Sequence, residues 1–176
     1  MVGRRNYLVE GVSGTGKTSV CRELRRRGFH AVNGDTDLAY QGDPETGEPS
    51  GDEPPSHWQH IWHVDAVRRL VADQDEEVTF FCGGSRNFSR FVELFDAVFV
   101  LEIDSDTLNH RLDQRPADEF GAQPSERELI VRLHRTKEDT PEGGISIDAT
   151  APLATVVDEI VRQARGTDAS ASADPA

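Results

Sequence analysis

The chain of 176 residues is poor in lysine, in cysteine and in long apolar runs, and each shortage excludes a class of protein. Only Lys17 and Lys137 are lysines, and the formal net charge is −13, so nucleic acid and anionic membranes are poor partners. Two cysteines, Cys21 and Cys82, do not suggest a disulfide framework. No apolar run approaches membrane-spanning length and no signal peptide precedes the first apolar segment. We therefore expect a cytoplasmic protein with no nucleic-acid or membrane partner.

The most informative segment present is GVSGTGKT at residues 11–18, which fits the pattern G-x-x-x-x-G-K-[ST]. It follows an apolar run at residues 7–9 and precedes a helical pattern at residues 19–27. In this context glycines let the backbone wrap around phosphates, and the N–H groups converge at a helix N-terminus. Lys17 can reach the β- and γ-phosphates, and the Thr18 hydroxyl can ligate Mg²⁺. The segment predicts a nucleoside triphosphate site formed by Gly11, Ser13, Gly14, Thr15, Gly16, Lys17, Thr18 and Ser19.

Apolar runs and helical patterns alternate along the chain. We predict strands at residues 7–9, 28–34, 78–82, 97–103 and 145–147. We predict helices at residues 19–27, 58–72, 88–94, 106–113, 125–139 and 153–165, the fifth begun by a capping box of Ser125 and Glu128. This alternation indicates an α/β fold with a five-stranded parallel sheet covered on both faces. The segment 41–56 is rich in glycine, proline and acids and is predicted to be a mobile surface loop.

Polar residues follow the predicted strands, where ligands of parallel sheets bind. Asp35 and Asp37 come after the second strand, and we expect both to reach the γ-phosphate region, one for Mg²⁺ and one to accept a proton. Asp37 is equally placed to cap a helix. The third strand ends in Gly83, Gly84, Ser85 and Arg86, which favours close approach of a substrate, although a tight turn alone explains one glycine.

Phosphoryl transfer also needs cations around the transferred group. Arg111 and Arg115 lie one helical turn apart, and Arg132 and Arg135 lie on the next predicted helix. In an acidic protein some of these are ordinary surface arginines. Arg115 and then Arg132 are the preferred catalytic candidates.

This arrangement resembles the P-loop nucleoside and nucleotide kinase superfamily, which includes adenylate, shikimate and gluconate kinases, over residues 7–165. GVSGTGKT resembles the gluconate-kinase loop, and Asp35-Thr36-Asp37 resembles the DxD of shikimate kinases. Arg111 and Arg115 are similar to the run entering a lid that clamps ATP, and Ala149, Ala151 and Pro152 to a loop that cradles adenine. The resemblance implies a three-layer α/β/α P-loop fold at residues 1–165, with an acceptor-binding region at about 36–75 and a small lid at about 111–127. It implies ATP as donor and Mg²⁺ held by Thr18 and Asp35, and residues 166–176 are predicted to be a disordered tail.

The acceptor region differs from those kinases in its charge. Residues 36–67 contain no Lys or Arg but seven acids, which would repel a phosphate or a carboxylate. A neutral or cationic hydroxyl compound fits better. Trp58 and Trp62, one helical turn apart, would stack on a base or sugar or equally pack in the core. His57, His60 and His63 share a helix face only loosely, so a metal site there is disfavoured.

The sequence therefore predicts a monomeric or homodimeric ATP- and Mg²⁺-dependent kinase of a small-molecule hydroxyl, with a nucleoside as the preferred acceptor. The predicted catalytic residues are Lys17, Asp35, Asp37, Arg115 and Arg132, and the predicted acceptor contacts are Asp37, Trp58, Trp62, Gly83, Gly84, Ser85 and Arg86. The alternatives are a nucleoside monophosphate kinase, in which Arg86 grips the acceptor phosphate, and a nucleotide-binding switch or slow ATPase that acts through a protein partner.

Overall fold

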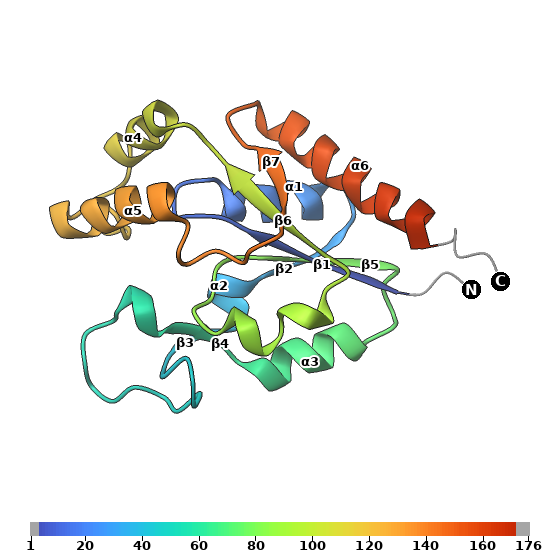
Figure 1. Cartoon of the computed structure of the whole chain (residues 1–176), viewed down its shortest axis with the longest axis horizontal. Coiled ribbons are helices and arrows are strands. Elements are labelled where there is room, and N and C mark those ends of the chain that lie inside the picture. Colours follow the sequence, from blue (N-terminus) through green and yellow to red (C-terminus); the bar gives the residue numbers. More distant parts are fainter. Residues whose placement is uncertain (1–3, 172–176) are drawn as a thin grey trace.

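The computed structural model describes residues 4–171 and is built on one five-stranded sheet (Figure 1). The strands are β1 (Arg5–Glu10), β2 (His30–Asn33), β5 (Val78–Cys82), β6 (Ala97–Glu102) and β7 (Ile145–Asp148). They lie in the order β2-β5-β1-β6-β7, and every neighbouring pair is parallel. The predicted five-stranded parallel sheet is confirmed.

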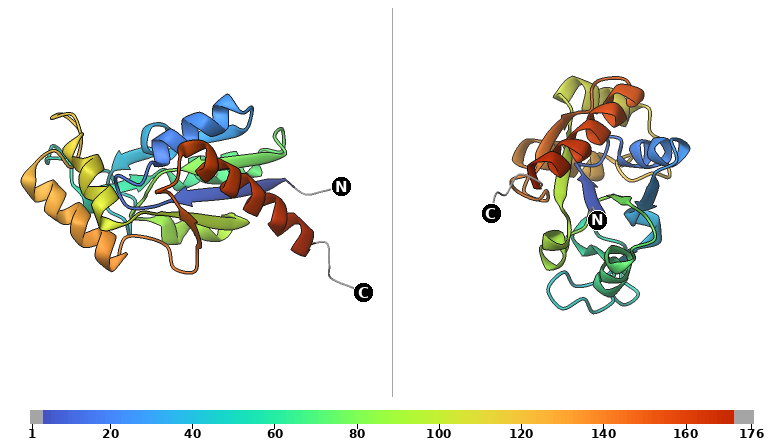
Figure 2. Two further views of the ribbon diagram at one scale, coloured as in Figure 1. Left: turned by 90° about the horizontal axis from the view of Figure 1, so that it is seen from above. Right: turned by 90° about the vertical axis from the view of Figure 1, so that its right-hand side faces the viewer.

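Helices cover both faces of the sheet (Figure 2). Successive side chains of a strand point to opposite faces, so each strand packs against both helical layers. Tyr7 and Val9 of β1 face the core shared with α1 (Lys17–Arg26) and α6 (Leu153–Ala171). Leu8 faces the opposite core, which includes Val67 of α3 (Val64–Ala72). Two further helices, α4 (Ser105–Asp113) and α5 (Pro124–Thr136), pack on the first core through Leu108, Leu112, Ile130 and Leu133. The three-layer α/β/α fold is therefore confirmed.

A small antiparallel hairpin stands beside the sheet. It joins β3 (Ala39–Gln41) to β4 (His60–Trp62), and a 3₁₀ turn at His57–Gln59 leads into β4. The predicted helix over residues 58–72 is wrong in its first six residues, since α3 begins only at Val64. The apolar spacing of this segment is that of a helix, but pairing with β3 holds residues 60–62 extended. Residues 41–56 are tied by the bridge between Gly42 and Pro49, and their predicted mobility stays untested.

Three other boundaries differ from the prediction. The capping box of α5 uses Gln123 and Glu126 in place of Ser125 and Glu128, because Pro124 favours the first position of a helix. Residues 88–94 form two 3₁₀ turns, Phe88–Arg90 and Val92–Leu94. The helix α6 runs to Ala171, past the predicted end at residue 165. The predicted disorder of residues 166–176 stays untested, and residues 172–176 lie outside the described residues. Within residues 4–171 no helix is long and apolar enough to cross a membrane.

Candidate active site

Two cavities of about 670 Å³ each open beyond the carboxyl ends of the strands. The phosphate-loop cavity is lined by residues 13–19 with Arg111, Arg115 and Ala149. The hairpin cavity is lined by residues on both sides of the β3–β4 hairpin, including Gln41, Ser56, His57 and His60. Both cavities are lined by Ser13, Lys17, Asp35 and Glu119. A group bound in one cavity therefore meets a group bound in the other at these shared side chains.

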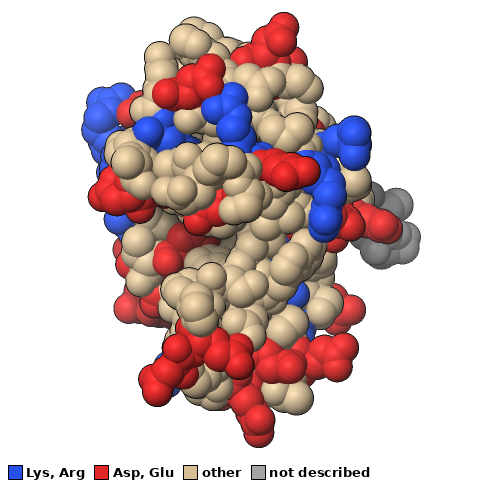
Figure 3. Space-filling model, turned by 90° about the vertical axis from the view of Figure 1, so that its left-hand side faces the viewer, with Lys and Arg blue, Asp and Glu red and all other residues tan. Residues whose placement is uncertain are grey.

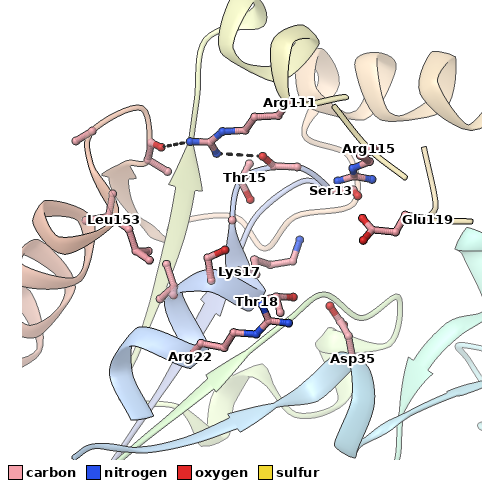
Figure 4. A pocket seen from close by; sticks show the side chains of 17 residues that line it. Ser13, Thr15, Lys17, Thr18, Arg22, Asp35, Arg111, Arg115, Glu119 and Leu153 are labelled. Carbon is pink, nitrogen blue, oxygen red and sulfur yellow. Dashed lines mark hydrogen bonds between the residues drawn. The ribbon is translucent and has the colours of Figure 1, made fainter. Parts of the chain in front are cut away.

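The phosphate loop connects β1 to α1 through backbone conformations that only glycine adopts easily. Gly14 and Gly16 have φ values of 96° and 101°, in the left-handed region. Lys17 begins α1, so the loop amides and the helix N-terminus face the cavity together. In Figure 4 the side chains of Lys17, Thr18 and Asp35 lie around the same space. The predicted loop residues line the phosphate-loop cavity, except Gly11, which lines the hairpin cavity and whose carbonyl accepts a hydrogen bond from Lys17.

Arg111 of α4 ties the phosphate loop to the segment after β7. Its Nη1 donates to the carbonyl of Gly14 at 3.1 Å and its Nη2 to the carbonyl of Ala149 at 2.9 Å (Figure 4). Arg115, one turn later, lines the same cavity and donates to the carbonyl of Phe120. Ala149 and Ala151 line this cavity, whereas Pro152 is not among its lining residues. The predicted nucleotide contacts thus converge, apart from Pro152.

Asp35 stands where the two cavities meet. It lies in α2 (Gly34–Asp37), a single turn after β2, and its Oδ1 accepts hydrogen bonds from His60 Nε2 and the Gly84 amide, both at 3.1 Å. Burial alone would raise the pKa of Asp35, but the His60 hydrogen bond and the charge of Lys17 hold this pKa below its ordinary value. Asp35 is therefore an ionised carboxylate in a fixed orientation.

Asp37 lies away from both cavities. Its carboxylate accepts hydrogen bonds from the Asn33 amide at 3.2 Å and from Arg25 at 3.4 Å, and the side chain is about half exposed. Residues two apart in a helix point to opposite sides, whereas the prediction assumed an extended segment. This placement contradicts the prediction that Asp37 reaches the γ-phosphate or the acceptor.

Arg86 lines the hairpin cavity but is held by a buried partner. Its Nη1 lies 2.8 Å from Asp139 Oδ2 and donates to the Asp139 carbonyl at 2.9 Å, and the two side chains are 7% and 4% exposed. His57 Nε2 donates to the same carboxylate at 3.1 Å. Burial acts to raise the pKa of Asp139, and the His57 hydrogen bond and the Arg86 charge together hold it below its ordinary value. The guanidinium charge of Arg86 is thus already neutralised within the protein.

Glu10, the last residue of β1, is a buried carboxyl group behind the site. Its side chain faces the charges of Lys17, Arg86 and Asp35, and burial raises its pKa to about 8 despite the two cations. A Cβ added at Gly84 would lie 2.8 Å from Glu10 Oε1, so glycine is needed where the chain passes over this carboxyl. Among the described residues Glu10 Oε2 has no hydrogen-bond partner.

Several predicted acceptor contacts are structural instead. Trp62 is fully buried and stacks on Phe91 at 5.5 Å, because it faces the core from β4. Trp58 is 42% exposed and lines neither cavity. Ser85 is buried and donates to Asn87, while Gly84 does line the hairpin cavity. Burial of Trp62 agrees with the alternative of core packing, and neither tryptophan lines a cavity in which an acceptor would stack.

Two further predicted site residues, Gly83 and Arg132, line neither cavity. Gly83 lies in close contact with other groups, since an added Cβ would meet Asp35 at 2.7 Å and Trp62 at 2.8 Å. Arg132 forms an ion pair with Glu138 at 2.8 Å, its side chain is half exposed, and it lines neither of the two cavities. Of the two preferred catalytic arginines, Arg115 lines the phosphate-loop cavity and Arg132 does not.

The sequence profile of a known family, described as AAA domain, matches residues 8–139. The chain belongs to this family. The match begins in β1 and includes the phosphate loop, both sides of the hairpin cavity and the Arg86–Asp139 pair. A search of curated proteins found no match.

Solved structures with the same fold include two bacterial proteins. A sugar kinase from Janibacter sp. HTCC2649 is 19% identical with a TM-score of 0.54, and the match covers 90% of this chain and 93% of that one. A gluconokinase from Sinorhizobium meliloti 1021 is 24% identical with a TM-score of 0.52, and the match covers 96% of this chain and 92% of that one. At these identities the comparison establishes the shared fold of this AAA domain.

Sequence reasoning missed several residues that line or support the site of this AAA domain. His57 and His60 were weighed only as metal ligands, although each donates to an aspartate, and in residues 4–171 no cluster of three possible metal ligands occurs. Glu10 carries a signal in the sequence, since an acid directly before the phosphate loop interrupts an apolar strand. Asp139 and Phe120 carry none, because only the fold brings them to the hairpin cavity.

Proposed function

We propose that the protein is an ATP-dependent kinase that transfers the γ-phosphoryl group to a hydroxyl group of a neutral or cationic small molecule. The observation that carries this proposal is that Lys17 and Asp35 line both cavities. A phosphoryl donor in the phosphate-loop cavity and a hydroxyl in the hairpin cavity would face each other across these two side chains. Positioning and electrostatic stabilisation supply most of the catalysis in such reactions.

Each group at the junction has a role in this reaction. Lys17 and the loop amides hold the β- and γ-phosphates, and Arg115 stabilises the negative charge of the group in transfer. Asp35 orients the acceptor hydroxyl and accepts its proton, with His60 and the Gly84 amide fixing Oδ1. Asp35 thus takes the role that the sequence assigned to Asp37.

The donor set also fits Mg²⁺. Hydroxyl and carboxylate oxygens with phosphate oxygens are its usual ligands, and the Thr18 hydroxyl and Asp35 both line the phosphate-loop cavity. These two residues would hold the ion, which when bound neutralises charge on the phosphates.

The charge of the hairpin cavity supports an acceptor without phosphate or carboxylate groups. Its lining includes five acids, Asp35, Asp118, Glu119, Glu126 and Asp139, against Lys17 and Arg86. Arg86 is paired with Asp139, so little positive charge is left for an anionic acceptor. In Figure 3 acidic side chains gather over the hairpin end of the molecule, whereas most Lys and Arg side chains lie toward the opposite end, among further acids.

Nucleosides stay the preferred acceptors within this class, although burial of Trp62 removes one of the two observations behind them. The sugar kinase and the gluconokinase that share this fold favour a polyhydroxylated acceptor in general. A nucleoside monophosphate kinase is disfavoured because it would need Arg86 free for a phosphate. We further propose a cytoplasmic protein, either a monomer or a homodimer, with residues 36–75 binding the acceptor and residues 111–127 acting as lid.

The proposal is tested by incubating the protein with ATP, Mg²⁺ and single acceptors, followed by mass spectrometry of the products. The panel contains nucleosides, sugars, amino-sugars, gluconate and nucleoside monophosphates. We expect phosphoryl transfer to at least one neutral or amino compound and none to the monophosphates. Transfer to monophosphates alone would establish the alternative kinase. ATP hydrolysis with no phosphorylated acceptor would instead favour the nucleotide switch.

A further inference from the structure

We propose that the hairpin cavity binds a planar ring of the acceptor between the side chains of His57 and Phe120. This inference rests on the proposed kinase function and names the part of the acceptor that the site recognises. Both side chains line the cavity. Their rings are nearly parallel, at 14°, with centroids 6.0 Å apart. Phe120 is 39% exposed, so much of this ring is uncovered within the described structure.

The His57 ring forms a wall whose orientation is fixed from behind. Its Nε2 donates to Asp139 Oδ2 at 3.1 Å, and Asp139 is in turn held by the buried Arg86. The Trp58 ring packs nearly perpendicular to it, at 86°, with centroids 5.1 Å apart. Asp139 and Trp58 therefore hold the ring plane, and one ring face is directed toward Phe120. Ring binding thus accounts for the fixed orientation of His57 by Asp139, which phosphoryl transfer alone does not require.

Phe120 forms the opposite wall and lies on the segment between α4 and α5. Its carbonyl accepts a hydrogen bond from Arg115, which lines the phosphate-loop cavity. The next amide, Gly121, donates to Glu126 at 2.9 Å. A ring in contact with both faces needs about 7 Å between them, since each face contact takes roughly 3.5 Å. The ring centroids are 6.0 Å apart, so a ring enters only when the segment that carries Phe120 moves away from His57.

The surroundings of the two rings define which ring fits. Asp118 and Glu119, beside Phe120, line the same cavity, so an anionic ring is disfavoured and a neutral or cationic one is favoured. Gln41 and Ser56 supply polar groups at the His57 side. The acceptor hydroxyl has to reach Asp35 at the junction of the cavities. A heteroaromatic ring attached to a hydroxyl-bearing group, as in a nucleoside, meets these conditions.

Binding is measured by calorimetry on the wild-type protein saturated with Mg²⁺ and a non-hydrolysable ATP analogue. This measurement needs no turnover, so failure of the kinase proposal does not decide it. The probes are cytidine, guanosine and pyridoxine, with methyl β-ribofuranoside and myo-inositol as hydroxyl compounds without an aromatic ring. We expect at least one ring-bearing probe to bind tenfold or more tightly than both ringless probes. Equal or weaker binding of all three ring-bearing probes overturns the proposal.

Variants of Phe120 separate ring binding from a structural role of the lid. We expect Phe120→Ala and Phe120→Leu to weaken the ring-bearing probe about fivefold to tenfold, and Phe120→Tyr to preserve its binding. Val131→Ala on α5 is the matched control, because Val131 is similarly exposed, at 42%, and lines neither cavity. Binding of the ringless probes should not change in any of these variants. An equal loss for ring-bearing and ringless probes, or no loss in Phe120→Ala, contradicts the inference.

Discussion

Asp35 accepts a hydrogen bond from His60 over 3.1 Å at the point where the two cavities meet. The bond joins the turn after β2 to strand β4 of the hairpin. The bond fixes the orientation of the Asp35 carboxylate. It also connects Asp35, which lines both cavities, to His60, which lines the hairpin cavity.

Substitution of Asp35 tests the proposed proton acceptor. We expect Asp35→Asn to lower kcat by about 10² to 10⁴-fold with a hydroxyl acceptor, because an amide cannot accept the proton and is a weaker ligand of Mg²⁺. The matched control is Asp37→Asn, two residues away and directed toward Arg25, which should keep kcat within a few-fold. Steady-state kinetics with the acceptor found in the panel checks both variants. A greater loss in Asp37→Asn than in Asp35→Asn would reverse the assignment.

His60 should set the pH range in which Asp35 works. The His60 hydrogen bond is the largest of the contributions that lower the pKa of Asp35, so His60→Ala should raise that pKa. Asp35 must be ionised to accept a proton, and the acid limb of the kcat/KM profile should therefore move to higher pH. His60→Gln keeps a donor and should shift the limb less. An acid limb that does not move in His60→Ala would show that His60 does not act through Asp35.

The Arg86–Asp139 pair should matter for stability more than for binding of anions. Removal of one partner leaves the other charge buried, and we expect Arg86→Met to lower the free energy of unfolding by about 3–5 kcal/mol in urea titrations. Arg127→Ala is the control, because Arg127 pairs with the exposed Asp113, and a loss of at most about 1 kcal/mol is expected. Unchanged stability of Arg86→Met together with lost binding of nucleoside monophosphates would instead identify a phosphate clamp.

Glu10 should make the stability of the ligand-free protein fall as the pH rises. Its pKa is raised from 4.5 to about 8 in the folded state, so above pH 4.5 the unfolded chain releases a proton that the folded chain keeps. Relative to Glu10→Gln, the wild type should lose stability from pH 4.5 to about 8, by a few kcal/mol at most, and then level off. Urea midpoints at a series of pH values measure this difference. A difference that grows toward acid pH would mean that Glu10 is ionised in the folded protein.

The sequence predicted the sheet and the phosphate loop because both depend on local patterns. Apolar runs such as residues 78–82 form the buried strands, and the glycines of residues 11–16 allow the one backbone path that exposes the loop amides. The predicted arginines, Arg111 and Arg115, lie at the cavity because α4 follows β6 directly. The binding roles of these residues stay predictions.

The errors arise where distant segments decide the conformation. Strand β4 forms because residues 39–41 pair with it, and nothing near Trp62 in the sequence reveals that partner. Asp35 and Asp37 are equivalent in sequence, but a single helical turn after β2 directs only Asp35 to the site. The side chain of Phe120 meets that of His57 across 62 intervening positions, and no local pattern links the two.

Burial of Trp62 has a mechanical consequence for the hairpin. A Cβ added at Gly34 would lie 2.0 Å from the indole, and the same ring stacks on Phe91, so β4 is locked into the sheet core. The hairpin therefore cannot move as a unit without removing Trp62 from the core. If the proposed lid moves, the acceptor side is expected to open and close through residues 114–123, which carry Phe120 and Arg115. In that case one short segment would respond both to the nucleotide and to the acceptor.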